Sequence, residues 1–182
     1  MIANRILVYG VTGSGKTTLA EKLSKATGIP CFEADSITWE PDWTEVPFEI
    51  QRDRIASICE QEAWILDSAY AKWMDIPLSR ADMIVALDYP RWISFWRLLT
   101  RSIARIVDKR SICNGNRETL RTLLSSESIL LWHIRSFEKK RGRIRSWSKT
   151  DPRVVVLRSP RDANEFLTYL KKPAQFAKSA LP

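Results

Sequence analysis

The sequence has few cysteines, a single histidine and no long apolar run. Its three cysteines are widely spaced, odd in number and without the close pairing of a metal site; they are Cys31, Cys59 and Cys113. We therefore expect small buried thiols in a reducing cytoplasm. His133, the only histidine, follows an apolar run and is expected to pack in the core. No uncharged apolar run approaches the length of a membrane span, so we expect a soluble cytoplasmic protein without a membrane partner.

Motifs of several nucleotide- and nucleic-acid-binding classes are also missing. No Asn-Lys-x-Asp sequence is present to read a guanine base, which argues against a GTPase. No helix-turn-helix, zinc-finger or RNA-recognition signature occurs. Because the chain also lacks internal repeats and low-complexity linkers, we expect residues 1–182 to form a single domain.

The net charge of +8 is distributed unevenly along the chain. Residues 1–90 carry 8 Lys and Arg against 14 Asp and Glu, whereas residues 91–182 carry 21 against 7. A basic half can bind nucleic acid, or it can supply arginines that close over the phosphates of a small substrate. It can also be a solvated surface, which is the interpretation we favour for the run from 139 to 145.

A glycine-rich stretch from Gly10 to Thr18 follows the apolar run Ile6–Tyr9. It fits the phosphate-binding pattern G-x-x-x-x-G-K-[ST], in which glycines let backbone N–H groups approach phosphate oxygens. The next helix directs its positive N-terminal end at the same anion, Lys16 adds a charge for the outer phosphates, and the Thr17 hydroxyl can bind Mg²⁺. We therefore predict ATP binding. The residues expected to contact the nucleotide here are Gly10, Thr12, Gly13, Ser14, Gly15, Lys16, Thr17 and Thr18.

Strand-like and helical segments alternate along the chain. The expected strands are 5–9, 29–32, 64–67, 83–88 and 154–157. The expected helices are 16–27, 47–61, 91–107, a basic region at 117–146, and 161–171. This alternation predicts an α/β fold of three layers, with a five-stranded parallel sheet and helices on both faces. Residues 91–149 would form a helical, basic lid, and ligands would bind at the carboxyl ends of the strands.

Acidic residues follow three of the expected strands. Glu33 and Asp35 come after the second strand with one residue between them, so in an extended chain both side chains point to the same side. Asp67 closes a Walker-B-like apolar run. We expect Asp35 to accept the proton of an attacking hydroxyl, and Asp67 and Glu33 to join Thr17 at a Mg²⁺ ion. For Asp88, beside a proline, we favour a turn or helix-cap role.

Basic residues in the second half are candidates for binding the transferred phosphoryl group. Arg97, Arg101 and Arg105 are spaced by four and would form one stripe on a helix. Because a guanidinium can bind two phosphate oxygens at once, we expect Arg97, Arg101 and Arg117 to clamp that group. Two alternatives stay open: a solvated basic helix, and a nucleic-acid surface in which interleaved aromatic residues stack on bases.

Two further regions are expected to contact ligands. After the last strand, Ser159 is expected to cap a helix that begins at Pro160, with Asp162 completing a capping box. A nucleotide base should lie near this loop, so Arg158 and Pro160 are expected to bind it. Trp39 and Tyr70 are expected to bind the acceptor, with core packing an equal alternative for Trp39.

These residues resemble those of the adenylate-kinase-like P-loop kinases, which include shikimate kinase and gluconate kinase. The unit Glu33-Ala34-Asp35 has the same offset from Lys16 as the Asp-x-Asp unit of shikimate kinases. The resemblance implies that Asp35 contacts the substrate hydroxyl and that Glu33 lies near the metal.

Nearly the whole chain is also similar to a group of bacterial predicted ATPases labelled topology modulation proteins or adenylate kinase-related proteins. The segments that carry this likeness are 33–39 with Trp43, 64–70, 87–91, 114–118 and 128–132. That group usually has Asp-Gly-Asn-Tyr where this chain has Asp67-Ser68-Ala69-Tyr70, so a glycine and an amide are missing from the turn. The sequence thus predicts a kinase that transfers the γ-phosphoryl of Mg-ATP to a small molecule or nucleotide. The alternative is a nucleic-acid-associated ATPase.

Overall fold

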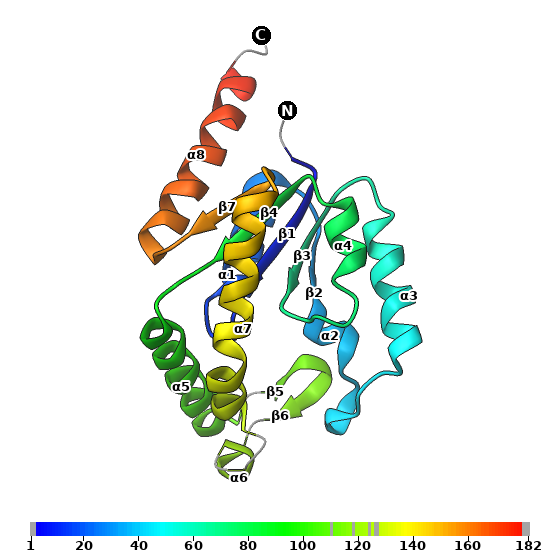
Figure 1. The fold of residues 1–182 in the computed structure, drawn as a ribbon, viewed down its shortest axis with the longest axis vertical. Helices are drawn as coiled ribbons and strands as arrows, with labels where there is room; N and C mark the ends of the chain where they lie inside the picture. Colours follow the sequence, from blue (N-terminus) through cyan, green and yellow to red (C-terminus); the bar gives the residue numbers. More distant parts are fainter. Residues whose placement is uncertain (1–2, 110, 118, 124, 126–127, 180–182) are drawn as a thin grey trace.

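Five parallel strands form the centre of the molecule, and helices cover both faces of the sheet (Figure 1). The computed structural model describes residues 3–109, 111–117, 119–123, 125 and 128–179, without the side chains of 111–113, 117 and 171–179. The strands of the sheet are β1 (Arg5–Gly10), β2 (Cys31–Glu33), β3 (Trp64–Ser68), β4 (Met83–Leu87) and β7 (Val154–Leu157). They lie in the order β2-β3-β1-β4-β7, and every neighbouring pair is parallel. The predicted sheet is confirmed.

Helices of very different lengths surround the sheet. The longer ones are α1 (Lys16–Thr27), α3 (Phe48–Cys59), α5 (Arg91–Val107), α7 (Ile129–Thr150) and α8 (Pro160–Ser179). The short elements are α2 (Ala34–Thr38), η1 (Pro41–Trp43), α4 (Asp75–Arg80), β5 (Ser111–Ile112), η2 (Cys113–Gly115), β6 (Asn116–Arg117) and α6 (Leu120–Leu123). Among the helices in the described ranges, none combines the length and the apolar character of a bilayer-spanning segment.

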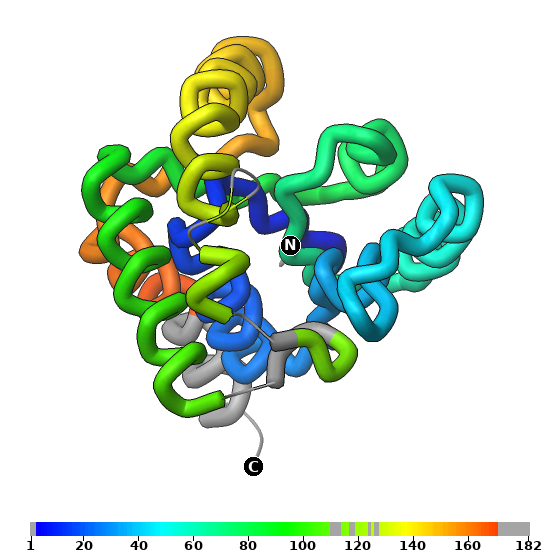
Figure 2. Tube along the Cα trace, turned by 90° about the horizontal axis from the view of Figure 1, so that it is seen from below, coloured from blue at the N-terminus to red at the C-terminus, as the bar shows by residue number. Residues whose placement is uncertain are grey.

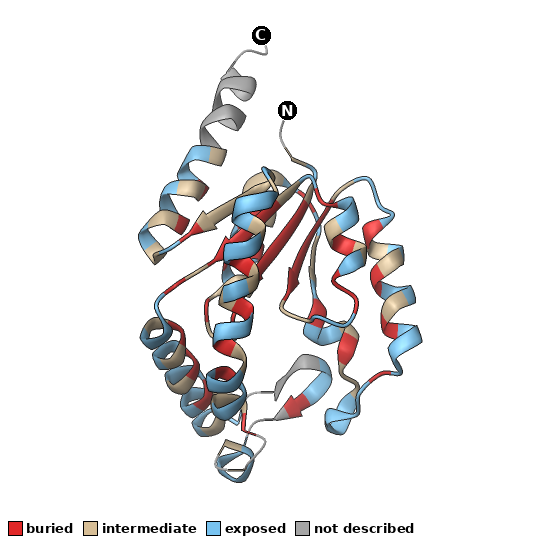
Figure 3. Cartoon of the chain, in the orientation of Figure 1, coloured by how far each residue is buried: buried red, intermediate tan, exposed pale blue. Residues whose placement is uncertain are grey.

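Alternate residues of β1 enter two different cores. Ile6 and Val8 face the core formed with α1 and α8, whereas Leu7 and Tyr9 face the core formed with α3 and α7. Figure 3 shows β1, β3 and β4 buried along almost their whole length, between helices that are exposed on their outer sides. Since both faces of the sheet are covered, its strands are apolar at successive positions, as parallel sheets require.

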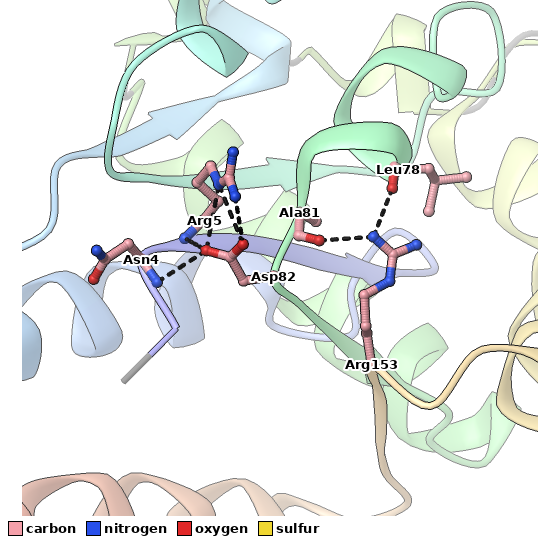
Figure 4. A network of polar contacts seen from close by, with 6 residues as sticks. All are labelled: Asn4, Arg5, Leu78, Ala81, Asp82 and Arg153. Atoms are coloured by element: carbon pink, nitrogen blue, oxygen red, sulfur yellow. Dashed lines mark hydrogen bonds and ion pairs between the residues drawn. The ribbon is translucent and has the colours of Figure 1, made fainter. Parts of the chain in front are cut away.

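Polar contacts tie the strands together at their amino ends (Figure 4). Asp82, just before β4, accepts hydrogen bonds from the backbone N–H of Arg5 (3.0 Å) and from its guanidinium (2.7 Å). Arg153, just before β7, donates to the carbonyls of Leu78 and Ala81 at 3.0 and 2.7 Å. These contacts anchor β1, β4 and β7 at the edge opposite the glycine-rich loop.

The basic region 117–146, expected to be helical, is helical in α6 and α7 but begins with the last residue of a short β-strand. A two-stranded antiparallel hairpin, β5–β6, follows α5, and the short α6 precedes α7. Asn114 (φ 55°) and Gly115 (φ 85°) adopt the left-handed backbone of the hairpin turn, which asparagine and glycine tolerate best. Residues 91–149 are therefore not wholly helical. A hairpin with strands of two residues is too short to give a hydrophobic period in the sequence.

Candidate functional site

The glycine-rich loop between β1 and α1 turns sharply against α5. Gly13 and Gly15 have φ values of +79° and +94°, and a Cβ at Gly13 would lie 2.3 Å from the carbonyl oxygen of Ser94. Only glycine fits at Gly13, because both its backbone conformation and the close approach of α5 exclude a side chain. The buried hydroxyl of Ser14 has no hydrogen-bond partner in the described chain. An unsatisfied buried polar atom in this loop fits a ligand with hydrogen-bonding oxygens.

Lys16, Thr17 and Asp67 meet where α1 begins and β3 ends. The Lys16 ammonium donates to the carbonyl of Val11 (3.3 Å) and lies 3.9 Å from Asp67 Oδ1. Thr17 Oγ1 donates to the other oxygen of Asp67 at 2.5 Å. Burial raises the pKa of Asp67, while the Lys16 charge and the Thr17 hydrogen bond lower it. The register of β1 on β3, with Val8 opposite Asp67, places this carboxylate beside the loop.

Glu33 and Asp35 belong to different elements, so the expectation that they lie in one extended stretch is wrong. Glu33 is the last residue of β2, and α2 begins at Ala34. The two acids nonetheless share one electrostatic environment with Asp67. Burial raises the pKa of Glu33, the charges of Asp67 and Asp35 raise it further, and Arg105 lowers it. The three expected carboxylates are therefore close enough to influence one another.

The Thr17–Asp67 pair is suited to hold a magnesium ion. No group of three or more His, Cys, Asp or Glu side chains that could bind a metal occurs in the part of the chain that the structure describes. Mg²⁺ in nucleotide enzymes uses one or two carboxylates and completes its shell with water and substrate phosphates. A hydroxyl hydrogen-bonded to one buried carboxylate provides hard oxygen ligands of that kind. The charge of Asp67 also raises the pKa of Glu33, the other carboxylate expected at the metal.

Asp35 is held by a chain of hydrogen bonds that begins at a tryptophan. The Trp39 indole donates to the Tyr70 hydroxyl at 2.9 Å, and the Tyr70 hydroxyl donates to Asp35 Oδ1 at 2.8 Å. The Tyr70 ring stacks on buried Trp73, with ring centroids 5.5 Å apart. Burial and the Asp35 charge raise the pKa of Tyr70, so its hydroxyl stays protonated and can only donate to the carboxylate. Trp39 and Tyr70, expected to bind the acceptor, thus orient Asp35.

The arginines of α5 face the glycine-rich loop and the acidic residues. Arg97 donates to the carbonyl of Ser14 (3.3 Å), and its guanidinium lies 5.7 Å from the centre of the Tyr89 ring. The charge of Arg101 lowers the pKa of Asp67, and that of Arg105 lowers the pKa of Glu33. The stripe therefore runs along the site. The side chain of Arg117, expected to join it, lies outside the described residues.

The β5–β6 hairpin is attached to the segment that follows Asp35. The Asn114 amide donates to the carbonyls of Ser36 (3.0 Å) and Trp39 (2.5 Å). The buried Asn116 amide donates to the Glu40 carbonyl (2.9 Å) and accepts from the Trp43 N–H (2.7 Å). Figure 2, which looks onto the carboxyl edge of the sheet, shows α5 on one side of this edge and the segment that contains α2 on the other. Two amides thus join the expected lid to the segment that carries Asp35.

The loop after β7 has the expected capping arrangement. Ser159 and Asp162 exchange side-chain and backbone hydrogen bonds, and Pro160 is the first residue of α8. Arg158 lines a cavity of about 430 Å³ between α7 and the ends of β4 and β7. Asp88 borders the same cavity and forms an ion pair with Arg141 at 2.9 Å. Contact of Arg158 and Pro160 with a nucleotide base stays a prediction.

Lys140 is a buried residue that the sequence analysis missed. It lies within the basic run 139–145, which we interpreted as solvated surface, yet its side chain is buried. It shares the buried stripe of α7 with His133, Phe137 and Ile144. The helical spacing of these four residues is visible in the sequence and could have predicted that Lys140 is buried. His133 is buried as expected, with Nε2 2.9 Å from Ser94 Oγ.

Comparison with known proteins shows the fold. No family model and no curated protein sequence matches the chain. A shikimate kinase from Bacteroides thetaiotaomicron superposes with a TM-score of 0.58 and 14% identity, over 95% of this chain and 99% of that one. A gluconokinase from Sinorhizobium meliloti 1021 superposes with a TM-score of 0.53 and 20% sequence identity, over 96% of this chain and 97% of that one. For a shikimate kinase from Aquifex aeolicus the TM-score is 0.54 and the sequence identity is 18%, over 94% of this chain and 98% of that one. The chain has the fold of the P-loop kinases.

Proposed function

We propose that this protein is a P-loop kinase that transfers the γ-phosphoryl group of Mg-ATP to a small molecule or nucleotide. The observation that carries the proposal is the location of Asp35. This carboxylate is held by Tyr70 within electrostatic reach of Asp67, and Asp67 contacts both Lys16 and Thr17. Phosphoryl transfer needs a phosphate cradle, a metal site and a group that orients the attacking hydroxyl, and these contacts support a candidate for each of the three.

Each part of the site has a role in this proposal. The loop Gly10–Thr18 and Lys16 bind the phosphates of ATP. Thr17 and Asp67, with Glu33, hold the magnesium ion, which when bound neutralises charge on the phosphates. Asp35 accepts the proton of the acceptor hydroxyl, and its hydrogen bond from Tyr70 fixes the carboxylate oxygen.

Arginine side chains complete the site. Arg97 and Arg101 are placed along it and would bind the transferred phosphoryl group. Residues 91–149 would act as a lid within a single domain. Because Asn114 and Asn116 bind the backbone of 36–43, movement of this lid would also move the segment after Asp35. The lid would therefore respond to the acceptor as well as to ATP.

A nucleic-acid-associated ATPase is the second candidate, and one observation favours it. Trp92, Trp96 and Trp132 are 72%, 62% and 55% exposed, in the basic half of the chain. Exposed aromatic rings among basic residues can stack on bases. Binding to single-stranded DNA or RNA that weakens steeply with salt would support this candidate, and no binding at low salt would remove it.

A phosphoryl-transfer screen tests the kinase proposal. The protein is incubated with Mg-ATP and a panel of nucleoside monophosphates and hydroxyl metabolites, and phosphorylated products are detected by mass spectrometry. The Lys16→Ala variant, purified in the same way, controls for contaminating kinases. We expect metal-dependent transfer to one class of acceptor with the native protein alone. Hydrolysis of ATP at the same rate with and without every acceptor would contradict the proposal.

Replacing Tyr70 with phenylalanine tests the orientation of Asp35. The ring and its stacking on Trp73 remain, but the hydrogen bond to Asp35 is lost. We expect kcat to fall about tenfold, since a hydrogen bond to a charged group contributes about 1.5 kcal/mol. Exposed Tyr169→Phe is the control, and an unchanged kcat in Tyr70→Phe would argue against this role.

A further inference from the structure

Lys140 is a buried cation without a neutralising partner. Its side chain is 9% exposed, and its ammonium lies 5.9 Å from the centre of the Trp132 ring. Within the described parts of the chain, no carboxylate lies within ion-pair distance of Lys140 and no hydrogen bond is made by its ammonium. Burying a charge without a partner is unfavourable, and proteins pair such groups or use them to bind ligands.

Two of the charged groups that shift the pKa of Lys140, Lys16 and Asp35, belong to the candidate transfer site. Burial is the main reason that its pKa falls to about 8; the charges of Lys16 and Arg143 lower the pKa further, and that of Asp35 raises it. The ammonium is therefore within electrostatic reach of both the loop lysine and the candidate base. Lys16 already contacts Asp67 and the Val11 carbonyl. Lys140 has no equivalent contact and is available to a bound anion.

The position of Lys140 in the fold assigns that anion to the acceptor. The phosphates of ATP are served by the loop, by α1 and by Arg97 on α5. Lys140 instead comes from α7, whose Ile144 packs in the core on the opposite side of the sheet from α1. Among the residues that act on its charge is Asp35, which marks the acceptor end of the site.

We propose that Lys140 binds an oxyanion, a carboxylate or a phosphate, that the acceptor carries in addition to the group that is phosphorylated. This inference rests on the proposed kinase function and narrows its substrate. Hydroxy acids and phosphate monoesters, including nucleotides, would be accepted. Neutral polyols and nucleosides would not be.

The first experiment compares matched acceptors and two variants. Each anionic acceptor is paired with a neutral counterpart: a nucleoside monophosphate with its nucleoside, and a hydroxy acid with its amide. We expect transfer to the anionic member only. Lys140→Met, which keeps the length of the side chain, should raise the KM of that acceptor at least tenfold with little change in the KM of ATP, and Lys140→Arg should recover part of the loss. Equal use of the neutral counterpart, or a raised KM for ATP alone, would overturn the proposal.

The second experiment does not depend on transfer. Thermal unfolding is followed with a saturating non-hydrolysable ATP analogue and Mg²⁺, with and without inorganic phosphate or citrate. We expect the anion to raise the Tm of the native protein and not that of Lys140→Met, whose Tm without anion should be the higher of the two. If the anion raised the Tm of the native protein alone, but no acceptor was phosphorylated, the kinase function would be refuted and the anion site would stand. An equal response of both proteins would refute the role of Lys140.

Discussion

The Asp35→Asn variant should lose phosphoryl transfer while still binding Mg-ATP. General base catalysis contributes roughly 10²- to 10⁴-fold, so kcat is expected to fall within that range. Asparagine preserves the shape of the side chain and can still accept the hydrogen bond from Tyr70, so the loss would reflect the missing charge. Product formation by mass spectrometry gives kcat, and isothermal titration gives the affinity for a non-hydrolysable ATP analogue.

A matched substitution separates this effect from a general change of charge. Asp53 on α3 is exposed, and Asp53→Asn removes one negative charge away from the site. We expect native activity in Asp53→Asn. If Asp35→Asn transferred phosphate as fast as Asp53→Asn, Asp35 would not be the base, and another group, such as Glu33, would have to orient the acceptor.

The Gly13→Ala variant should lose both stability and nucleotide binding. Its Cβ would meet the Ser94 carbonyl oxygen at 2.3 Å and the Leu98 Cβ at 2.9 Å, in a backbone with φ +79°. The left-handed conformation costs about 1–2 kcal/mol, and overpacking adds roughly 1–3 kcal/mol. We expect the free energy of unfolding to fall by about 3 kcal/mol in urea titrations. Displacement of the loop from α5 should also weaken Mg-ADP binding strongly.

Gly28 provides the control for the backbone contribution. It has the same φ of +79° at the end of α1, and a Cβ there would meet nothing within 4 Å. Gly28→Ala should cost about 1 kcal/mol and leave nucleotide binding intact. The difference between the two variants then measures the steric conflict with α5. Equal losses of stability would mean that the loop can move away from Ser94 at no cost, contrary to the close packing described here.

The phosphate loop and the sheet were predictable because their signals are local. The pattern from Gly10 to Lys16 follows an apolar strand and precedes a helix, so its residue types and spacing suffice to predict it. The five apolar runs are close to the observed strands, since strands buried on both faces are apolar throughout. The elements missed, α2, α4 and the β5–β6 hairpin, are short, and a few residues cannot establish a period.

The contacts around Asp35 and the segment that follows it could not be predicted from the local sequence pattern. The hydrogen bond between Tyr70 and Asp35 joins residues 35 positions apart, and those of Asn116 reach back more than 70 positions. Such pairs meet only when β2 and β3 lie side by side and the hairpin folds back onto α2 and η1. Lys140 was misjudged for a related reason. Its basic neighbours in sequence are exposed or half-buried, but the packing of α7 turns this one lysine inward.

The sequence by itself determined that this protein has a parallel α/β sheet and a glycine-rich loop with the phosphate-binding pattern, with acidic residues at the strand ends. Those features depend on residue types at short spacing and on hydrophobic periodicity, both of which are properties of the chain. The tertiary structure decided that Tyr70 holds Asp35, that the hairpin binds the segment after it, and that Lys140 is buried where the Asp35 charge raises its pKa. Those relations depend on which distant segments pack together, because burial and distance set the charge environment of each group.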